Sequence, residues 1–312
     1  MNRLVAAVVL VGVVLCLLPA CATRSRFQGW SLLNRRLDAP QPPTGRRQSL
    51  EADLARAEAA LAAAPRDEDA AIWRGRRLAY LGRYREAIDA YSLALVDHPA
   101  SYRLLRHRGH RWITLREFDR ATDDLARAAD LARGAPDEIE PDGAPNPANR
   151  PRSTTQSNIY YHLGLAHYLS RRFAVAHNAY LEGLPYARVN DDMLVATTYW
   201  LYLTNRRLGH DAEAAALLAA ITPTMEIMEN SAYHRLLLLF KGEITPEEVA
   251  AARDEGEIAD ATIGYGLGMY WWLRGDRKQA EQMWRGVLRG PNWVAFGFIA
   301  AEVEIARLQK PR

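Results

Sequence analysis

Residues 75–99, GRRLAYLGRYREAIDAYSLALVDHP, decide the fold, because their pattern of small, aromatic and proline residues returns 34 positions later. Gly75 recurs as Gly109, and Pro99 repeats an earlier proline, Pro65, at the same interval. The other matched pairs are Tyr84 and Phe118, Ala87 and Ala121, Tyr91 and Leu125, and Ala94 and Ala128. A fixed interval of this length predicts stacked helical hairpins, in which small residues allow close helix packing and prolines end helices.

These residues resemble the tetratricopeptide (TPR) family, whose unit is a helix–turn–helix of about 34 residues. Weaker copies follow around Gly164, Gly209 and Gly268, and residues 230–253 form a degenerate hairpin in which Thr245 caps the second helix. The resemblance implies an all-α solenoid of about five to six helical hairpins.

The solenoid is expected to fill residues 49–312, with a leading helix at its start and a C-terminal capping helix over residues 293–308. In the capping helix, apolar residues fall on one side and Glu302, Glu304 and Arg307 elsewhere, as expected for a helix that closes a repeat array against water.

The first 20 residues are typical of a bacterial signal peptide. Arg3 supplies the positive charge, and residues 4–18 form an apolar run that is too short for a convincing membrane span. Leu18-Pro19-Ala20-Cys21 resembles the lipobox of bacterial lipoproteins. That resemblance implies cleavage before Cys21 and attachment there of lipid, with palmitate among the acyl chains. An uncleaved anchor and an ordinary secretory signal cut near Ala22 are the alternatives.

A lipid-anchored protein of the bacterial cell envelope follows from this signal. Ala22 is not the aspartate that retains lipoproteins in the inner membrane of enteric bacteria, so the outer membrane, facing the periplasm, is favoured. The net charge of +3 over 312 residues is too small for a nucleic-acid-binding surface. The two cysteines, Cys16 in the signal and Cys21 at the lipid, leave none in the mature chain for a disulfide, a nucleophile or a metal.

Two segments outside the repeats are rich in proline. Residues 21–48, with the lipidated cysteine at their start, are expected to be a flexible tether because they show no apolar periodicity. Residues 134–156 interrupt the repeat and begin with acidic side chains. This Pro-rich insertion is either a solvated loop or a segment that folds back over the concave face and gates it.

The sequence offers little for catalysis. His107 and His110 lie three apart on one expected helix, but Arg106, Arg108 and Arg111 surround them and discourage a metal ion. No phosphate-binding loop, nucleophile motif or metal-ligand helix occurs. We therefore expect no enzyme activity, no metal and no cofactor.

In the TPR family, the first helix of each unit lines a concave groove. The register carries this role onto arginines and aromatic residues, a composition suited to binding proteins and acidic peptides. Packing between helices is the alternative for the tyrosines. The groove residues predicted in this way are Arg76, Tyr80, Arg103, Arg106, His110, Tyr161, Tyr168, Tyr199, Arg206 and Arg207.

The sequence as a whole predicts a membrane-anchored scaffold or adaptor that binds other envelope proteins in a basic, aromatic groove. Its plan resembles TPR adaptor lipoproteins of bacterial outer membranes. The alternatives are a ligand-binding or enzymatic solenoid with a site under the Pro-rich insertion, and a structural subunit of an outer-membrane assembly complex.

Overall fold

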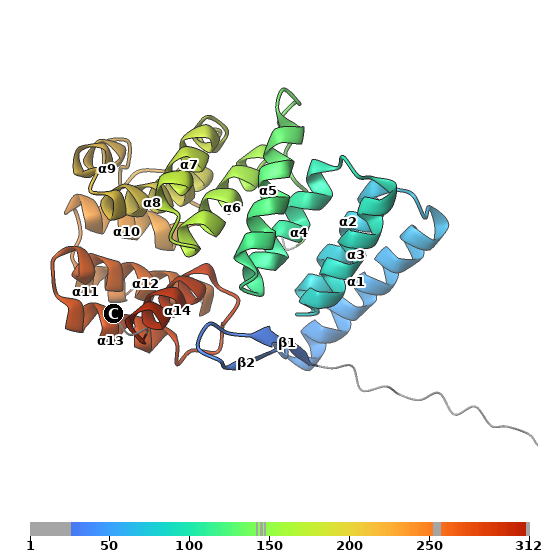
Figure 1. Cartoon of the computed structure of the whole chain (residues 1–312), viewed down its shortest axis with the longest axis horizontal. Helices are drawn as coiled ribbons and strands as arrows, with labels where there is room; N and C mark the ends of the chain where they lie inside the picture. Colours follow the sequence, from blue (N-terminus) through green and yellow to red (C-terminus); the bar gives the residue numbers. More distant parts are fainter. Residues whose placement is uncertain (1–25, 142, 144–145, 147, 252–256, 310–312) are drawn as a thin grey trace, which may run out of the picture.

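The protein is described by a computed structural model that covers residues 26–141, 143, 146, 148–251 and 257–309. Figure 1 shows a right-to-left succession of helices that curls back on itself. The helices are α1 (Thr44–Ala63), α2 (Glu68–Tyr80), α3 (Tyr84–Asp97), α4 (Tyr102–Thr114), α5 (Phe118–Ala132), α6 (Thr155–Leu169), α7 (Phe173–Ala187), α8 (Asp191–Leu208), α9 (Asp211–Leu218), α10 (Ser231–Lys241), α11 (Pro246–Ala251), α12 (Glu257–Leu273), α13 (Arg277–Val287) and α14 (Phe296–Gln309).

Consecutive helices pack in pairs, from α2 with α3 to α12 with α13, with α1 before the first pair and α14 after the last. The described residues thus form six hairpins, and the predicted all-α solenoid of TPR type is confirmed. The helix α1 begins at Thr44 rather than near Ser49, and α14 begins at Phe296 rather than at Trp293. No helix within the described ranges is long and apolar enough to span a membrane.

The repeated glycines mark the places where the two helices of a hairpin touch. A Cβ atom added to Gly75 would lie 2.1 Å from the Tyr91 ring, and one added to Gly109 would lie 2.6 Å from Leu125. Gly164 faces Tyr180 in the same way. Because such distances are too short for any side chain, the register found in the sequence is the register of helix packing.

Residues 27–38 of the expected tether are folded, which corrects that prediction for this part of it. Residues 27–38 form an antiparallel hairpin of β1 (Phe27–Trp30) and β2 (Arg36–Asp38). The Gln28 carbonyl accepts a hydrogen bond from Arg85 of α3 (2.6 Å), and the Asp38 carbonyl accepts one from the indole of Trp293 (3.0 Å). Polar backbone contacts of this kind leave no apolar periodicity in the sequence, so the hairpin was not foreseen.

The helix α14 lies inside the curl of the solenoid instead of only covering its end. It contacts α12, α13 and α6, and the β hairpin closes the gap between α14 and the first repeats (Figure 1). Glu302 and Glu304, expected on the polar side of a cap, are 1% and 2% exposed. Arg116 pairs with Glu302 at 2.7 Å, and Arg207 pairs with Glu304. The two carboxylates tolerate burial because each has an arginine partner.

Candidate functional site

The inner face of the solenoid carries a continuous cleft, which we call the inner cleft. It consists of three adjoining cavities of about 210, 280 and 840 Å³. Arg76 and Glu140 line both smaller cavities, while Arg106 and His110 line the smallest and the largest. The cleft therefore extends from α2 past α4 and α6 to α10 and α12.

Residues 138–141 of the Pro-rich insertion fold back over this cleft. Glu140 N–H donates to the Ser153 carbonyl and Thr155 N–H to the Glu138 carbonyl, both at 2.9 Å. These bonds hold residues 138–140 beside the start of α6, where Thr154 and Ser157 cap the helix. We call residues 138–141 together with Gly143 the crossing segment.

The crossing segment is held by a buried carboxylate. The Glu140 carboxylate lies 3.1 Å from Nε of Arg106 and 3.8 Å from Nε2 of His107, and it accepts a hydrogen bond from the Asn158 amide (3.1 Å). The Arg106 and Glu140 side chains are 8% and 10% exposed. An ion pair this well shielded is much stronger than a surface pair.

The main chain of the crossing segment is bound as well. Arg76 donates to the Pro141 carbonyl (2.6 Å), and Arg77 donates to the Gly143 carbonyl (3.1 Å). Gly143 lies against Tyr80, where a Cβ atom would be 2.4 Å from the phenol oxygen. Side chains of α2 thus bind an extended segment through its main-chain carbonyl groups, which every peptide has.

Neutral histidines line the wall of the cleft. Burial lowers the pKa of His107, His110 and His162 well below the usual value, and the neighbouring Arg106 and Arg111 lower these pKa values further. The rings of His110 and His162 lie 4.3 Å apart, next to Phe296. At neutral pH these rings contribute stacking surfaces and single hydrogen bonds rather than charge.

The groove residues predicted on α2 and α4 do line the inner cleft. Arg76, Tyr80, Arg106 and His110 surround the smallest cavity. Arg103 lines the adjoining one, where it pairs with Glu68 (3.5 Å) and Asp69. The sequence register therefore located one end of the cleft, although it did not predict that Arg106 is already paired.

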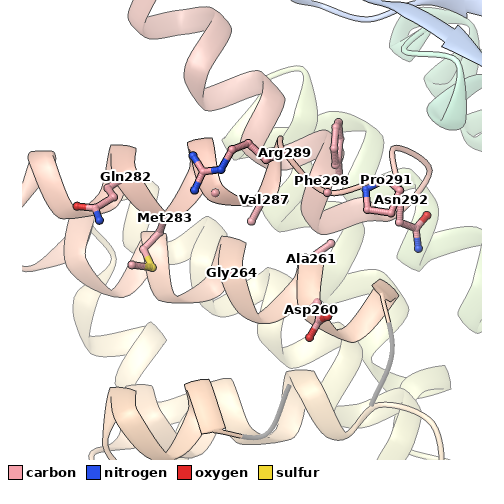
Figure 2. A pocket seen from close by; sticks show the side chains of 12 residues that line it. Asp260, Ala261, Gly264, Gln282, Met283, Val287, Arg289, Pro291, Asn292 and Phe298 are labelled. Atoms are coloured by element: carbon pink, nitrogen blue, oxygen red, sulfur yellow. The ribbon is translucent and has the colours of Figure 1, made fainter. Parts of the chain in front are cut away.

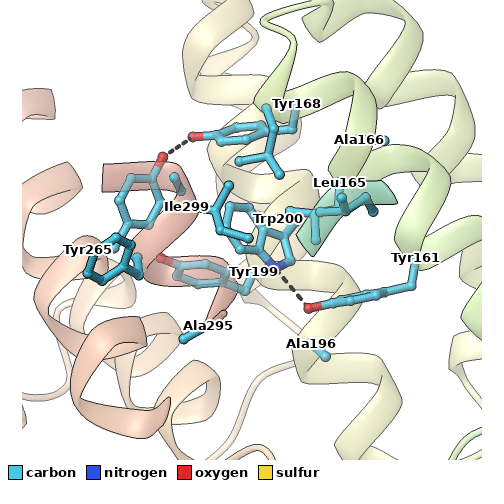
Figure 3. Close-up of a cluster of buried hydrophobic side chains, with 14 of the residues drawn as sticks. Tyr161, Leu165, Ala166, Tyr168, Ala196, Tyr199, Trp200, Tyr265, Ala295 and Ile299 are labelled. Carbon is cyan, nitrogen blue, oxygen red and sulfur yellow. Dashed lines mark hydrogen bonds between the residues drawn. The ribbon is translucent and has the colours of Figure 1, made fainter. Parts of the chain in front are cut away.

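The tyrosines predicted on α6 and α8 belong to the core, which corrects their assignment. Tyr199 is fully buried and Tyr168 is 3% exposed, and only Tyr161 reaches the largest cavity with one edge. Figure 3 shows how their hydroxyls are used internally. The indole of Trp200 donates to Tyr161 (3.0 Å), and Tyr168 is hydrogen-bonded to Tyr265 (2.7 Å). The cause is that Ile299 of α14 and Ala295, the residue directly before this helix, pack beside these rings.

Arg207 is also unavailable to a partner at the inner face, because α14 covers it, whereas Arg206 is partly exposed. Arg207 pairs with Glu304 of α14 and lies over the Trp272 ring, and its side chain is 3% exposed. Arg206 pairs with Asp211 at 2.8 Å at the start of α9. The groove prediction was wrong here because the array curls far enough for its own last helix to occupy the concave face.

Two functional residues were missed. Arg111 lines the smallest cavity but stands one place after His110, outside the positions at which the family lines its groove. Asp192, near the start of α8, is fully buried, pairs with Arg152 (3.0 Å) and accepts hydrogen bonds from the N–H groups of residues 228–230. The cap is Asn190. The sequence feature that could have indicated the place of Arg111 in the cleft is its charge inside a repeat helix.

Another cavity, of about 310 Å³, lies between α12 and α13. Figure 2 shows it bordered by Gly264, Val287 and Phe298, with Asp260 and Arg289 at its rim. Both charged residues are exposed to solvent. Among the residues that the structure describes, no three histidine, cysteine or carboxylate side chains gather as a metal site would require.

Comparison with known proteins gives only distant matches. No family model and no curated protein sequence matches the chain. Among solved structures, YrrB, described as a TPR protein with an unusual peptide-binding site, is 13% identical and has a TM-score of 0.42. The match covers 78% of this chain and 95% of YrrB. MamA is 16% identical with a TM-score of 0.36, over 76% of this chain and 97% of MamA. The conclusions below therefore rest on the contacts within this chain.

Proposed function

We propose that this protein is an interaction scaffold that holds an acidic, extended segment of a partner protein in the inner cleft. The observation that carries the proposal is the crossing segment. It occupies the cleft as a peptide ligand would, with its Glu140 carboxylate at Arg106 and its carbonyl groups at Arg76 and Arg77. The cleft thus has the groups needed to bind another segment of the same chemistry.

A partner segment would have to displace the crossing segment, and the contacts of that segment are compatible with this. Ile139 at its centre is 66% exposed, so displacement of the crossing segment would expose little additional apolar surface to water. A competing carboxylate would replace Glu140 at Arg106 and keep that arginine paired. Because one carboxylate replaces another, the exchange avoids the large free-energy cost of leaving a buried guanidinium without a partner.

A synthetic peptide with the sequence of residues 136–143, PDEIEPDG, tests this proposal. We expect it to bind a full-length variant in which residues 138–143 are replaced by glycine and serine. The unaltered protein should bind the peptide about tenfold or more weakly, because a tethered segment competes at an effective concentration near the millimolar range. Fluorescence anisotropy of a labelled peptide measures both affinities.

A matched control is the same peptide with glutamine at the two glutamate positions, which should bind the variant much more weakly. If the segment-replaced variant binds neither peptide, the inner cleft is not a peptide site and the proposal fails.

A photo-crosslinking amino acid placed at Tyr80 tests the proposal in cells. Tyr80 borders the smallest cavity, whereas Leu93 on the outer side of α3 is 71% exposed and serves as the control position. Crosslinks to a discrete partner from position 80 alone support the scaffold. Crosslinks from position 93 alone would contradict it and favour the assembly-subunit alternative, which uses the convex face.

We further propose that the scaffold is attached to the bacterial envelope by lipid on Cys21, with the outer membrane as its site and envelope proteins as its partners. The support is the sequence of residues 1–21, since Cys21 lies outside the described residues. We expect labelled palmitate to be incorporated into the protein and a Cys21→Ala variant to lose both the label and membrane association. A Cys16→Ala variant is the control. Equal labelling of the protein and the Cys21→Ala variant would exclude lipidation at Cys21.

A second candidate function rests on the largest cavity. Its 840 Å³ lie between His110, His162, Tyr161 and Phe296, a mixture of stacking surfaces and hydrogen-bonding groups that is typical of small-molecule sites. A bulky substitution, Ala196→Trp, would fill this cavity and leave the crossing segment in place. Loss of peptide binding in that variant would place the partner in the largest cavity, whereas unchanged binding leaves that cavity for a separate ligand.

A further inference from the structure

The smallest cavity contains an arginine that has no acidic partner. Arg111 is half-buried on α4, and within the described residues no carboxylate lies within 4.0 Å of its guanidinium and no hydrogen bond reaches it. Its guanidinium lies 5.6 Å from the centroid of the uncharged Tyr84 ring. A guanidinium always carries its charge, so this position holds a desolvated cation without an anion.

Arg76 is the second cation of the same cavity without a carboxylate. Its guanidinium donates to the Pro141 carbonyl and the Tyr80 hydroxyl and stacks on Trp73, all of them uncharged groups. Among the described residues, no carboxylate forms an ion pair with it. Burial lowers the pKa of Arg111, and repulsion from the positive charge of Arg76 lowers it further.

The other two arginines of the cavity are paired with carboxylates. Arg106 faces Glu140, and Arg152 faces Asp192 at 3.0 Å. Glu229 at the rim accepts a hydrogen bond from Asn146. Arg76 and Arg111 are therefore the two guanidinium groups without a carboxylate partner in this cavity of about 210 Å³, which has the Glu229 carboxylate at its rim.

We propose that Arg76 and Arg111 form a binding site for a phosphate group. A phosphate or phosphate monoester carries close to two negative charges at neutral pH, which matches the two unpaired guanidinium groups, whereas a single carboxylate would leave one of them uncompensated. Its oxygens accept the forked N–H groups of arginine, and the Tyr80 hydroxyl adds a further donor. The phosphate comes either from solution or from a phosphorylated residue of the partner segment, and only the second source rests on the function proposed above.

Titration calorimetry of the full-length protein in detergent with inorganic phosphate tests this site. We expect one phosphate bound per chain, about tenfold or weaker binding to Arg111→Gln and to Arg76→Gln, and unchanged binding to Arg133→Gln. Arg133 is the matched control because its side chain is 73% exposed and pairs only with an equally exposed Asp130. No heat of binding beyond that of chloride at equal ionic strength would overturn the proposal.

Two further measurements separate the alternatives. Acetate, a single carboxylate, should bind weakly in place of phosphate, and acetate binding as tight as that of phosphate would overturn the assignment to phosphate. Without phosphate, Arg111→Gln should melt at the same temperature as the unaltered protein or higher, because it removes an unpaired charge. A large drop in melting temperature would mean that Arg111 has a structural partner and would contradict the site.

The source of the phosphate is distinguished with the peptide PDEIEPDG extended by phosphoserine or by serine, on the segment-replaced variant. Tighter binding of the phosphorylated peptide assigns the site to the partner. Equal binding of the two peptides, together with phosphate binding, assigns it to a free phosphate. Because the serine peptide reports on the peptide cleft and inorganic phosphate on the arginine pair, either proposal can fail while the other stands.

Discussion

At the scale of the residue, the glycines of the first helices set the distance between paired helices. A methyl group at Gly75 would overlap the Tyr91 ring, so Gly75→Ala should lower the free energy of unfolding by about 1–3 kcal/mol. Gly45→Ala on α1 is the control, since nothing lies within 4 Å of that position, and its effect should stay within about 0.5 kcal/mol. Urea denaturation measures both variants. Equal stability of the two would contradict the role of Gly75 in close packing.

The ion pair between Arg116 and Glu302 is a second test at this scale. Both side chains are at most 2% exposed, so Glu302→Gln should cost about 3–5 kcal/mol of stability by leaving Arg116 buried without a counter-charge. Asp130→Asn removes the partner of the exposed Arg133 and should cost less than about 1 kcal/mol. A loss of similar size in the two variants, seen by chemical denaturation, would mean that the Arg116 pair is solvated.

At the scale of the element, α4 and α6 meet through His110 and His162. Burial lowers the pKa of both histidines, and it lowers the pKa of His167 on α6 to about 4. As the pH falls below about 6.5, the unfolded chain takes up protons that the folded chain does not, so the folded state loses stability down to about pH 4. We expect the urea concentration at the midpoint of unfolding to decrease as the pH is lowered from about 7.5 to about 5.

The variant His162→Gln isolates this contribution, because it should flatten the dependence on pH, whereas His210→Gln at an exposed position should leave it unchanged. A His162→Gln variant with the full pH dependence of the unaltered protein would show that His162 is protonated equally in the folded and unfolded chains.

The helices were predictable from sequence because their determinants are local. Gly75 and Tyr91 lie within one hairpin, and Thr245 caps the helix that follows it directly. The β hairpin and the position of α14 were not, since their contacts join distant residues. Leu32 donates its N–H to Glu302, 270 positions away. Neither residue belongs to a sequence pattern that would indicate so distant a partner. The buried tyrosines were misassigned for the same reason.

At the scale of the molecule, the β hairpin connects the first and last parts of the array. Deletion of residues 26–38 should expose one side of α3 and of Trp293 and remove the bond from Leu32 to Glu302. We expect faster amide hydrogen exchange throughout α14 and a lower melting temperature. Trp30→Ser is the control, because Trp30 is 59% exposed. Unchanged exchange in α14 after the deletion would show that the hairpin does not support this helix.

Closure of the array has a mechanical consequence. A helical-repeat protein behaves like a spring, because each repeat touches only its neighbours and small changes of pitch add up along the array. In this protein the β hairpin and α14 connect the first and last parts of the array. Stretching the array would therefore require the buried pair of Arg116 and Glu302 to separate. The crossing segment is not part of this closure, so it is the part of the structure that can move. If the proposed partner segment binds in the inner cleft, it is therefore expected to enter by displacing the crossing segment and not by expansion of the array.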